Sequence, residues 1–257
     1  MNRLFTFGCS FTYYYWQTWA DIIGTQFNTY QNWGQAGAGN NFITSNLYEC
    51  NSLYKINKDD VVMIMFSSID RFDYINQQSY FVTKGSVYGE SHPLGSDFVL
   101  NEWSDEHAVY MTWYSILSAK TLLDSIGCKY IFMKAFDFDS HNGYNLKINK
   151  ESNRINHCIN EINTILKGPS LYEMNKECGD FYKFNDTPNQ MDGHPTIKTH
   201  LKWVKENLKD YYHEEMDEIC KLWETKIPLN RNDNNTQPKK SYREFLDFKT
   251  KNILKII

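Results

Sequence analysis

Two short segments, one near each end of the sequence, contain the residue types of a nucleophile and its base. Ser10 follows an apolar run and opens a predicted helix, and His194 precedes Pro195 just before another. A serine in that position has free backbone N–H groups beside it, which can stabilise an oxyanion. A histidine can accept the serine proton when a carboxylate such as Asp192 sets its tautomer. Taken separately, Ser10 also fits a helix N-cap, and the histidine segment fits a polar turn.

A small-residue segment, residues 34–39, is the candidate for the oxyanion part of such a site. Its three glycines leave backbone N–H groups open to an oxyanion or a phosphate. It differs from the dinucleotide-binding fingerprint, because the third glycine of that pattern is missing and the segment follows the second predicted strand rather than the first. The alternatives are therefore an oxyanion loop or a tight turn.

In order and spacing, these segments resemble the blocks of the SGNH/GDSL hydrolase family, in particular compact members of phage-type proteins. Those members begin with a strand and Phe-Gly-Cys-Ser-Phe-Thr and end in Asp-x-His-Pro, and the resemblance covers residues 3–208. It implies that Ser10 is the nucleophile, His194 the general base and Asp192 the acid that orients the imidazole. It also implies that the oxyanion lies between the N–H groups of Ser10 and Gly37.

The chain departs from the usual family blocks at two places. The third block, normally Gly-x-Asn-Asp after the third strand, contains no asparagine here, and Ser68 is its nearest positional match as a third oxyanion donor. Arg71 is the alternative group that could compensate. The acid and the histidine are usually three residues apart rather than two, so Asp186 is a second candidate for the acid beside Asp192.

The resemblance implies hydrolysis of an acyl ester through an acyl-enzyme, with no metal or cofactor. Because the family includes esterases, lipases, thioesterases and carbohydrate deacetylases, the expected substrate is a small-molecule or glycan acyl ester. Asn32, Asn40 and Arg71 are predicted to contact it, and the aromatic residues within 74–103 favour a sugar ester. The alternatives are a non-catalytic structural or interaction protein on the same scaffold, for example in a virion, and a flavin- or nucleotide-binding domain.

The order of the predicted elements determines where these residues meet. Apolar runs predict strands at residues 4–8, 29–33, 61–66, 130–136 and 180–184, and helical spacing predicts helices at residues 11–23, 43–54, 108–126, 153–166, 197–208 and 214–224. Strands that alternate with helices indicate a parallel sheet covered on both faces. We therefore expect a three-layer α/β/α flavodoxin-like sandwich with five parallel strands in the order 2-1-3-4-5. Ligands of such sheets bind at the carboxyl ends of the strands.

The chain divides into two predicted parts. Residues 1–210 form the α/β domain, interrupted by an insertion at residues 70–107 that shows no clear periodicity. A loop of that length in a compact domain is usually functional or mobile. Residues 211–257 form a C-terminal helical extension, with a polar linker at residues 229–240 and an amphipathic helix at residues 241–257.

Composition limits the partners and the compartment. The chain has 257 residues and a formal net charge of −4, which argues against a nucleic-acid partner because such proteins need a basic face. Its six cysteines are scattered without metal-ligand spacing, so we expect free thiols in a reducing cytoplasm, with virion association if the protein is phage-encoded. No signal peptide is recognisable, and no stretch approaches the apolar length of a membrane span.

Overall fold

The fold is described from a computed structural model, which covers residues 3–77, 81–89, 92–138, 152–183 and 192–227. Its centre is a parallel sheet of four strands in the order β2-β1-β3-β6. The strands are β1 (Arg3–Gly8), β2 (Thr29–Asn32), β3 (Val61–Phe66) and β6 (Lys129–Lys134). The predicted strands and their order 2-1-3-4 are thus confirmed. The prediction of a fifth strand is wrong within the described residues. Residues 180–183 contain only an isolated bridge and do not join the sheet.

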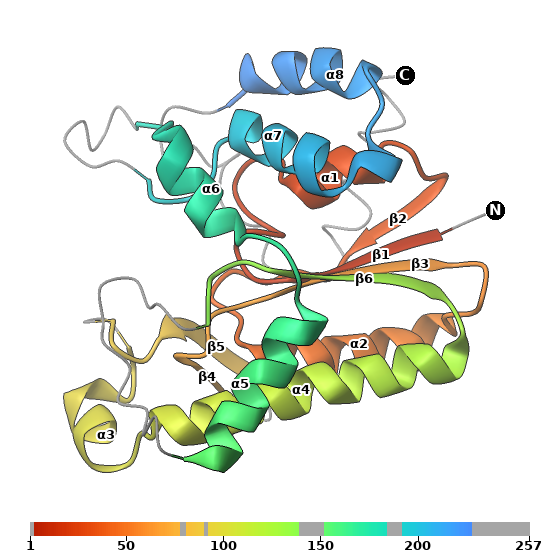
Figure 1. Cartoon of the computed structure of the whole chain (residues 1–257). Helices are drawn as coiled ribbons and strands as arrows, with labels where there is room; N and C mark the ends of the chain where they lie inside the picture. The colour runs from red at the N-terminus through yellow and green to blue at the C-terminus, as the bar shows by residue number, and fades with distance from the viewer. Residues whose placement is uncertain (1–2, 78–80, 90–91, 139–151, 184–191, 228–257) are drawn as a thin grey trace.

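Helices cover both faces of the sheet, as the three-layer prediction requires (Figure 1). On one face lie α1 (Trp19–Gly24), α6 (Leu171–Cys178), α7 (Ile197–Asn207) and α8 (Glu215–Glu224), with a short 3-10 turn (Lys209–Tyr211) between the last two. On the other lie α2 (Asn40–Tyr54), α4 (Asp105–Ile126) and α5 (Asn153–Ile165). The fold class is therefore the α/β sandwich expected from the sequence, and α6 is a helix that the sequence did not predict.

The insertion at residues 70–107 has regular structure of its own. It contains an antiparallel hairpin of β4 (Arg71–Ile75) and β5 (Phe81–Ser86), followed by α3 (Gly95–Asn101). The hairpin lies near the end of the sheet at which β1 and β3 finish (Figure 1). Polar and aromatic residues alternate too irregularly in this segment for the sequence to predict these elements.

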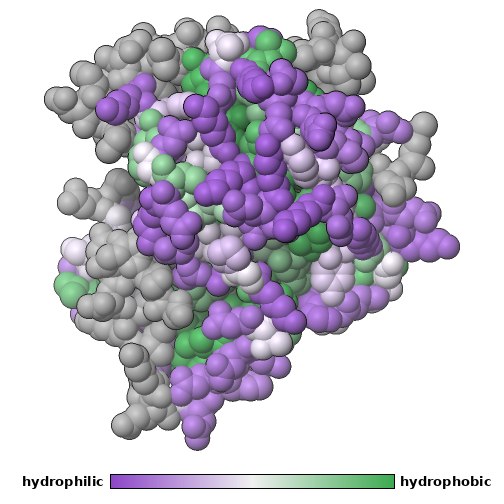
Figure 2. All heavy atoms as spheres, turned by 45° about the horizontal axis from the view of Figure 1, so that its top comes forward, coloured by the Kyte–Doolittle hydropathy of each residue, from purple (hydrophilic) through white to green (hydrophobic). Residues whose placement is uncertain are grey.

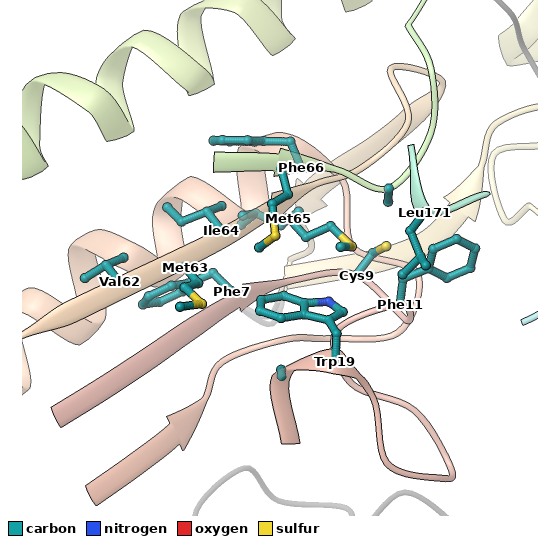
Figure 3. Packing of buried hydrophobic residues seen from close by; sticks show 14 of the residues in the cluster. Phe7, Cys9, Phe11, Trp19, Val62, Met63, Ile64, Met65, Phe66 and Leu171 are labelled. Carbon is teal, nitrogen blue, oxygen red and sulfur yellow. The ribbon is translucent and has the colours of Figure 1, made fainter. Parts of the chain in front are cut away.

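The core is built on β3, whose six residues are all buried. Successive side chains of a strand point to opposite faces, and Figure 3 shows Val62, Ile64 and Phe66 on one side of β3 and Met63 on the other. Trp19 from α1 is completely buried on the side of Met63. Both faces of the sheet are therefore packed, which explains why β3 is apolar without alternation.

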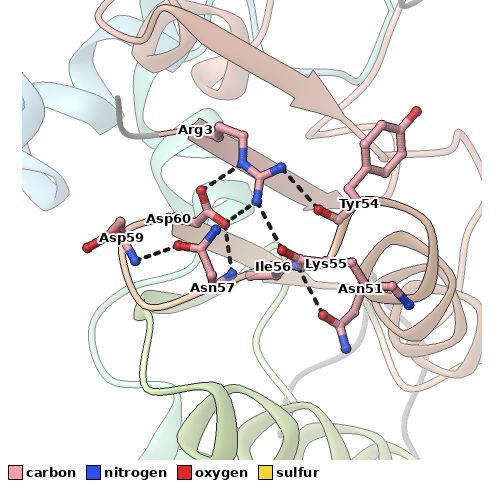
Figure 4. A network of polar contacts seen from close by, with 8 residues as sticks. All are labelled: Arg3, Asn51, Tyr54, Lys55, Ile56, Asn57, Asp59 and Asp60. Carbon is pink, nitrogen blue, oxygen red and sulfur yellow. Dashed lines mark hydrogen bonds and ion pairs between the residues drawn. The ribbon is translucent and has the colours of Figure 1, made fainter.

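A polar network closes the end of the sheet opposite the hairpin (Figure 4). The guanidinium of Arg3 binds both carboxylate oxygens of Asp60, with Nε–Oδ1 2.8 Å and Nη2–Oδ2 2.6 Å. It also donates to the carbonyls of Tyr54 and Lys55, where α2 ends. Burial opposes ionisation of Asp60, but the hydrogen bonds from Arg3 outweigh it and hold the pKa of this carboxyl below its usual value. The network joins the start of β1 to the turn that precedes β3.

The face in Figure 2 is mainly hydrophilic, with apolar side chains visible between polar ones. None of the helices in the described part of the chain combines the length and apolar character of a membrane span. The six cysteines are free. The predicted linker at 229–240, the helix at 241–257 and the acid candidate Asp186 lie outside the described residues.

Candidate active site

Ser10 lies in a tight turn at the carboxyl end of β1. The N–H groups of Thr12 and Tyr13 both donate to the carbonyl of Cys9, at 2.9 and 3.1 Å, and Ser10 is only 5% exposed. The prediction that Ser10 opens a helix is wrong, since α1 begins only at Trp19. Any oxyanion stabilisation at Ser10 must therefore come from this turn rather than from a helix dipole.

The helix starts late because its capping residues stand further along the chain. The carboxylate of Asp21 accepts the backbone N–H of Thr18 at 2.9 Å, which fixes the first turn of α1. The hydroxyl of Thr18 in turn donates to the carbonyl of Thr12 at 2.6 Å. This hydrogen bond holds the end of the non-helical segment 11–18 against the turn that contains Ser10.

Asp192 and His194 form a short hydrogen-bonded pair. Nδ1 of His194 lies 2.6 Å from Oδ1 of Asp192, and the backbone N–H of His194 donates to the same oxygen at 2.9 Å. Burial disfavours the charge of Asp192, but the hydrogen bonds from His194 and Tyr14 outweigh it and hold the pKa of Asp192 at about 2. An ionised Asp192 fixes the proton on Nδ1 and leaves Nε2 as the basic nitrogen. The two-residue spacing is therefore sufficient for an orienting contact.

The turn after β1 also contacts this pair directly. The ring of Tyr14 stacks on the imidazole of His194, with centroids 3.7 Å apart and planes at 19°, and its hydroxyl donates to Oδ2 of Asp192 at 2.8 Å. Phe11 contacts the same imidazole edge-on at 5.7 Å. Since Phe11 is the neighbour of Ser10, the structure brings the serine turn and the histidine segment together. Among the described residues, no hydrogen bond joins Ser10 to His194, and such bonds are often formed only with substrate bound.

Sequence reasoning missed Tyr14. It stands in a run of three tyrosines, and nothing in their pattern distinguishes one from the others. Only the tertiary contact with a segment 178 positions away identifies it.

The second segment of the candidate site, residues 34–39, lies beside the end of β1. The N–H of Gln35 donates to the carbonyl of Gly8 at 3.0 Å, which fixes the segment there. Gly37 has φ +82°, and a Cβ on it would lie 2.8 Å from the carbonyl oxygen of Thr83. Both facts require glycine at this position. Among the described residues, the backbone N–H groups of Ser10 and Gly37 have no hydrogen-bond acceptor, so both are available to an anion.

The amide side chains of Asn32 and Asn40 are used within the protein. Asn32 donates to the carbonyl of Thr12 at 2.8 Å and accepts the N–H of Gly34 at 2.9 Å, so it joins the two loops of the candidate site. Asn40 exchanges hydrogen bonds with the N–H and the carbonyl of Ser67, at 2.7 and 3.0 Å. Both side chains position loops, and their contact with a substrate stays a prediction.

Ser68 follows β3 at the predicted edge and is 3% exposed. Its hydroxyl donates to Oδ1 of Asp70 in a short hydrogen bond. A hydroxyl has one proton to donate, so Ser68 can serve as a third oxyanion donor only if this contact is broken. Its role in the oxyanion hole stays a prediction.

The hairpin of the insertion holds the loop that contains Gly37. Both carboxylate oxygens of the buried Asp73 accept backbone N–H groups, from Gly39 at 2.9 Å and from Phe42 at 3.0 Å. Burial raises the pKa of Asp73, although these two N–H groups favour its charged form. The N–H of Gly85 donates to the carbonyl of Gly37 at 3.0 Å. Sequence reasoning missed Asp73 because it stands in a segment without recognisable periodicity.

Arg71 connects this hairpin to the aromatic residues near His194. Its guanidinium donates to the carbonyl of Ala38 at 3.1 Å and lies 5.5 Å from the ring centroid of Phe136. Phe136 packs against Phe11, which contacts His194. Arg71 also lines a cavity of about 80 Å³, together with Asn41, Phe72, Trp103, His107 and Met111 among others.

Comparison with known proteins gives only distant similarities. No protein-family model matches the chain, and no curated protein matches it by sequence. A psychrotrophic esterase from Pseudoalteromonas sp., in a structure inhibited by monoethylphosphonate, is 9% identical at TM-score 0.46, covering 82% of this chain and 98% of that one. A lipolytic G-D-S-L family member from Veillonella parvula is 10% identical at TM-score 0.40, covering 81% and 100%. A GDSL-like lipase from Bacteroides thetaiotaomicron is 13% identical at TM-score 0.42, covering 85% and 89%.

The solved structures that resemble this chain thus include an esterase and GDSL-type lipolytic proteins. The identities and TM-scores of these matches are too low to establish an activity, so the function of this chain is inferred from its own residues. The likeness to phage-type members stays a prediction.

Proposed function

We propose that this protein is a serine hydrolase that cleaves acyl esters, with Ser10 as nucleophile, His194 as general base and Asp192 as the acid that orients it. The observation that carries the proposal is the Asp192–His194 pair, held against the turn of Ser10 by Tyr14 and Phe11. A buried, ionised carboxylate bonded to Nδ1 leaves the imidazole able to accept a proton at Nε2.

In the proposed reaction, Oγ of Ser10 attacks the acyl carbonyl while Nε2 of His194 accepts the hydroxyl proton. The tetrahedral intermediate collapses, the C–O bond to the alcohol breaks, and the imidazolium protonates the departing alkoxide. Water then attacks the acyl-enzyme, with His194 as base again, and Ser10 recovers its proton as the acid is released. The complete cycle of acylation and deacylation returns the site to its starting protonation state, so no cofactor is required.

The oxyanion is proposed to lie between the N–H groups of Ser10 and Gly37. Both groups are unoccupied within the described residues. Loss of one donor typically costs about 2.7–4 kcal/mol of transition-state stabilisation. With the hydroxyl of Ser68 bound to Asp70, we expect slow turnover of simple esters unless substrate binding redirects Ser68.

The proposed substrate is a small-molecule or glycan acyl ester. Arg71 and the aromatic rings of the insertion are the groups we propose as contacts. Phe72 and Trp103 pack edge to face at 5.9 Å and line the cavity beside Arg71. The lining combines these aromatic rings with the charged side chains of Arg71 and Asp73, which suits an ester that also carries polar groups.

A non-catalytic structural or interaction protein on this scaffold is the second candidate. The bond from Ser68 to Asp70 favours it, because it leaves fewer donors for an oxyanion than the family pattern would provide. The two candidates differ in a simple assay, since only a hydrolase releases product from an activated ester.

Hydrolysis of a short-chain p-nitrophenyl ester by wild-type protein, Ser10→Ala and Ser67→Ala tests the proposal. Ser67 is the matched control, because it is buried in the neighbouring loop and its hydroxyl has no partner among the described residues. We expect Ser10→Ala to abolish turnover while its melting temperature changes little, and Ser67→Ala to behave as wild type. Turnover that survives Ser10→Ala would exclude Ser10 as the nucleophile.

A further inference from the structure

We propose that Tyr14 is a positioning residue that fixes both the carboxylate of Asp192 and the ring of His194 for proton transfer. This inference rests on the proposed function, in which His194 is the base. Tyr14 contacts both partners of the pair and directly follows the turn that holds Ser10. It therefore couples the nucleophile's turn to the base.

The hydroxyl of Tyr14 determines how Asp192 is oriented. It donates to Oδ2 at 2.8 Å, whereas Nδ1 of His194 contacts Oδ1 at 2.6 Å. Each carboxylate oxygen thus has its own donor, and rotation of the carboxylate would break both hydrogen bonds. A hydrogen bond to a charged acceptor is stronger than a neutral one, so this orientation is well defined.

The ring of Tyr14 determines the plane of the imidazole. The two rings are nearly parallel, at 19°, and their centroids are 3.7 Å apart. Tyr14 is itself held by the ring of Trp16, edge-on at 4.7 Å, and the indole N–H of Trp16 donates to the carbonyl of Pro195 at 2.8 Å. Tyr14 therefore contacts both members of the Asp192–His194 pair, and its neighbour Trp16 binds the residue that follows His194.

Removing only the hydroxyl separates these two roles. In Tyr14→Phe the ring remains, but the carboxylate of Asp192 loses the donor that holds Oδ2. Asp192 then fixes the proton of His194 on Nδ1 less firmly, so the ¹⁵N chemical shifts of the two ring nitrogens are expected to move toward each other at pH 9. The carboxylate is also freer to rotate, so we expect kcat to fall by about tenfold with little change in KM. That is at the lower end of the losses seen when a partner that orients a metal-bound histidine is removed.

The experiment compares wild type, Tyr14→Phe and the control Tyr15→Phe by the ¹⁵N chemical shifts of the His194 ring at pH 9, and by kcat and KM. Tyr15 is the matched control, because it is the adjacent tyrosine, is exposed, and contacts Tyr14 only with its ring edge. The same NMR measurement is repeated for Tyr14→Phe in an Asp192→Asn background. The effect of Tyr14→Phe should disappear there, since it acts through the carboxylate, whereas a general structural effect would persist.

A change in the ¹⁵N chemical shifts of His194 in Tyr14→Phe, absent in Tyr15→Phe and abolished by Asp192→Asn, supports the proposal. Chemical shifts in Tyr14→Phe equal to those of wild type, or a change that persists in Asp192→Asn, overturn it. The NMR result does not depend on turnover, so it decides the role of Tyr14 even if wild type hydrolyses no ester. Absence of turnover in wild type would count against the proposed function alone.

Discussion

The carboxylate of Asp73 accepts the backbone N–H of Gly39 at 2.9 Å, across 34 positions of sequence. Its other oxygen accepts the N–H of Phe42, so this one side chain of the insertion holds the segment that follows Gly37. The insertion is therefore part of the framework of the proposed oxyanion loop. This relationship leads to the first prediction.

Asp73→Asn should lower kcat by roughly tenfold with KM little changed, because an amide can accept only one of the two N–H groups and places an N–H against the other. Steady-state kinetics and amide hydrogen exchange at Gly39 and Phe42 check this. Asp105→Asn is the control, since Asp105 is also buried in this region but accepts hydrogen bonds from Tyr88 and Trp103 instead. Equal loss of kcat in both variants would show a general effect on stability.

Gly37→Ala should lower both stability and turnover. The residue has φ +82°, and the added methyl would lie 2.8 Å from the carbonyl oxygen of Thr83, so the loop must shift. Gly95→Ala is the control, with φ +70° and open space around its Cβ. Each variant is expected to lose about 1–2 kcal/mol of unfolding free energy from the left-handed backbone alone. Only Gly37→Ala should also reduce kcat, as measured below the melting temperature; unchanged kcat would exclude Gly37 from the oxyanion hole.

Asp192→Asn should reduce turnover by up to about 10⁴-fold, because the amide favours the wrong tautomer of His194. Asp186→Asn should then be nearly silent. The pKa of Asp192 is held at about 2, so this carboxyl is fully ionised above pH 4. Its ionisation should therefore cause no change in the rate of hydrolysis between pH 4 and 8. A rate lost in Asp186→Asn but kept in Asp192→Asn would assign the acid to Asp186.

His200 should make the protein less stable in acid. Burial in α7 lowers the pKa of His200 to about 3, against an unfolded value of 6.5. Between these two values the unfolded chain binds a proton that the folded chain does not, so stability rises with pH and is lost as pH falls. The free energy of unfolding, measured with urea between pH 3 and 6.5, should rise less steeply with pH in His200→Phe than in wild type. The difference in slope should be up to about 1.4 kcal/mol per pH unit. An unchanged slope would mean that His200 is protonated in the fold.

The sequence predicted the sheet and the Asp192–His194 segment because both depend on local patterns. An apolar run such as that of β3 is recognisable without its neighbours, and so is a histidine followed by proline before a helix. The predicted position of Ser10 after β1 is confirmed, but the predicted helix is not, because its real cap is Thr18 with Asp21. Ser10 and Thr18 are both residue types that favour an N-cap, and the sequence alone does not show at which of them the helix begins.

Other parts of the candidate site depend on contacts between distant segments. Tyr14 and Asp73 are identified only by their hydrogen bonds to Asp192 and Gly39. Neither has a motif, and each belongs to a type that is common in ordinary turns. The hydrogen bond of Ser68 is local, to Asp70 two positions further on, but no sequence motif indicates it.

The central claim is that Ser10 is activated by His194, and covalent labelling with a fluorophosphonate tests it most directly. The probe forms a P–O bond with an activated serine and releases fluoride, so intact-mass spectrometry with peptide mapping shows where it reacts. The account predicts a single adduct at Ser10 in wild type and in Ser67→Ala, and none in Ser10→Ala or His194→Gln. Unlabelled wild type, or equal labelling of wild type and His194→Gln, would contradict it.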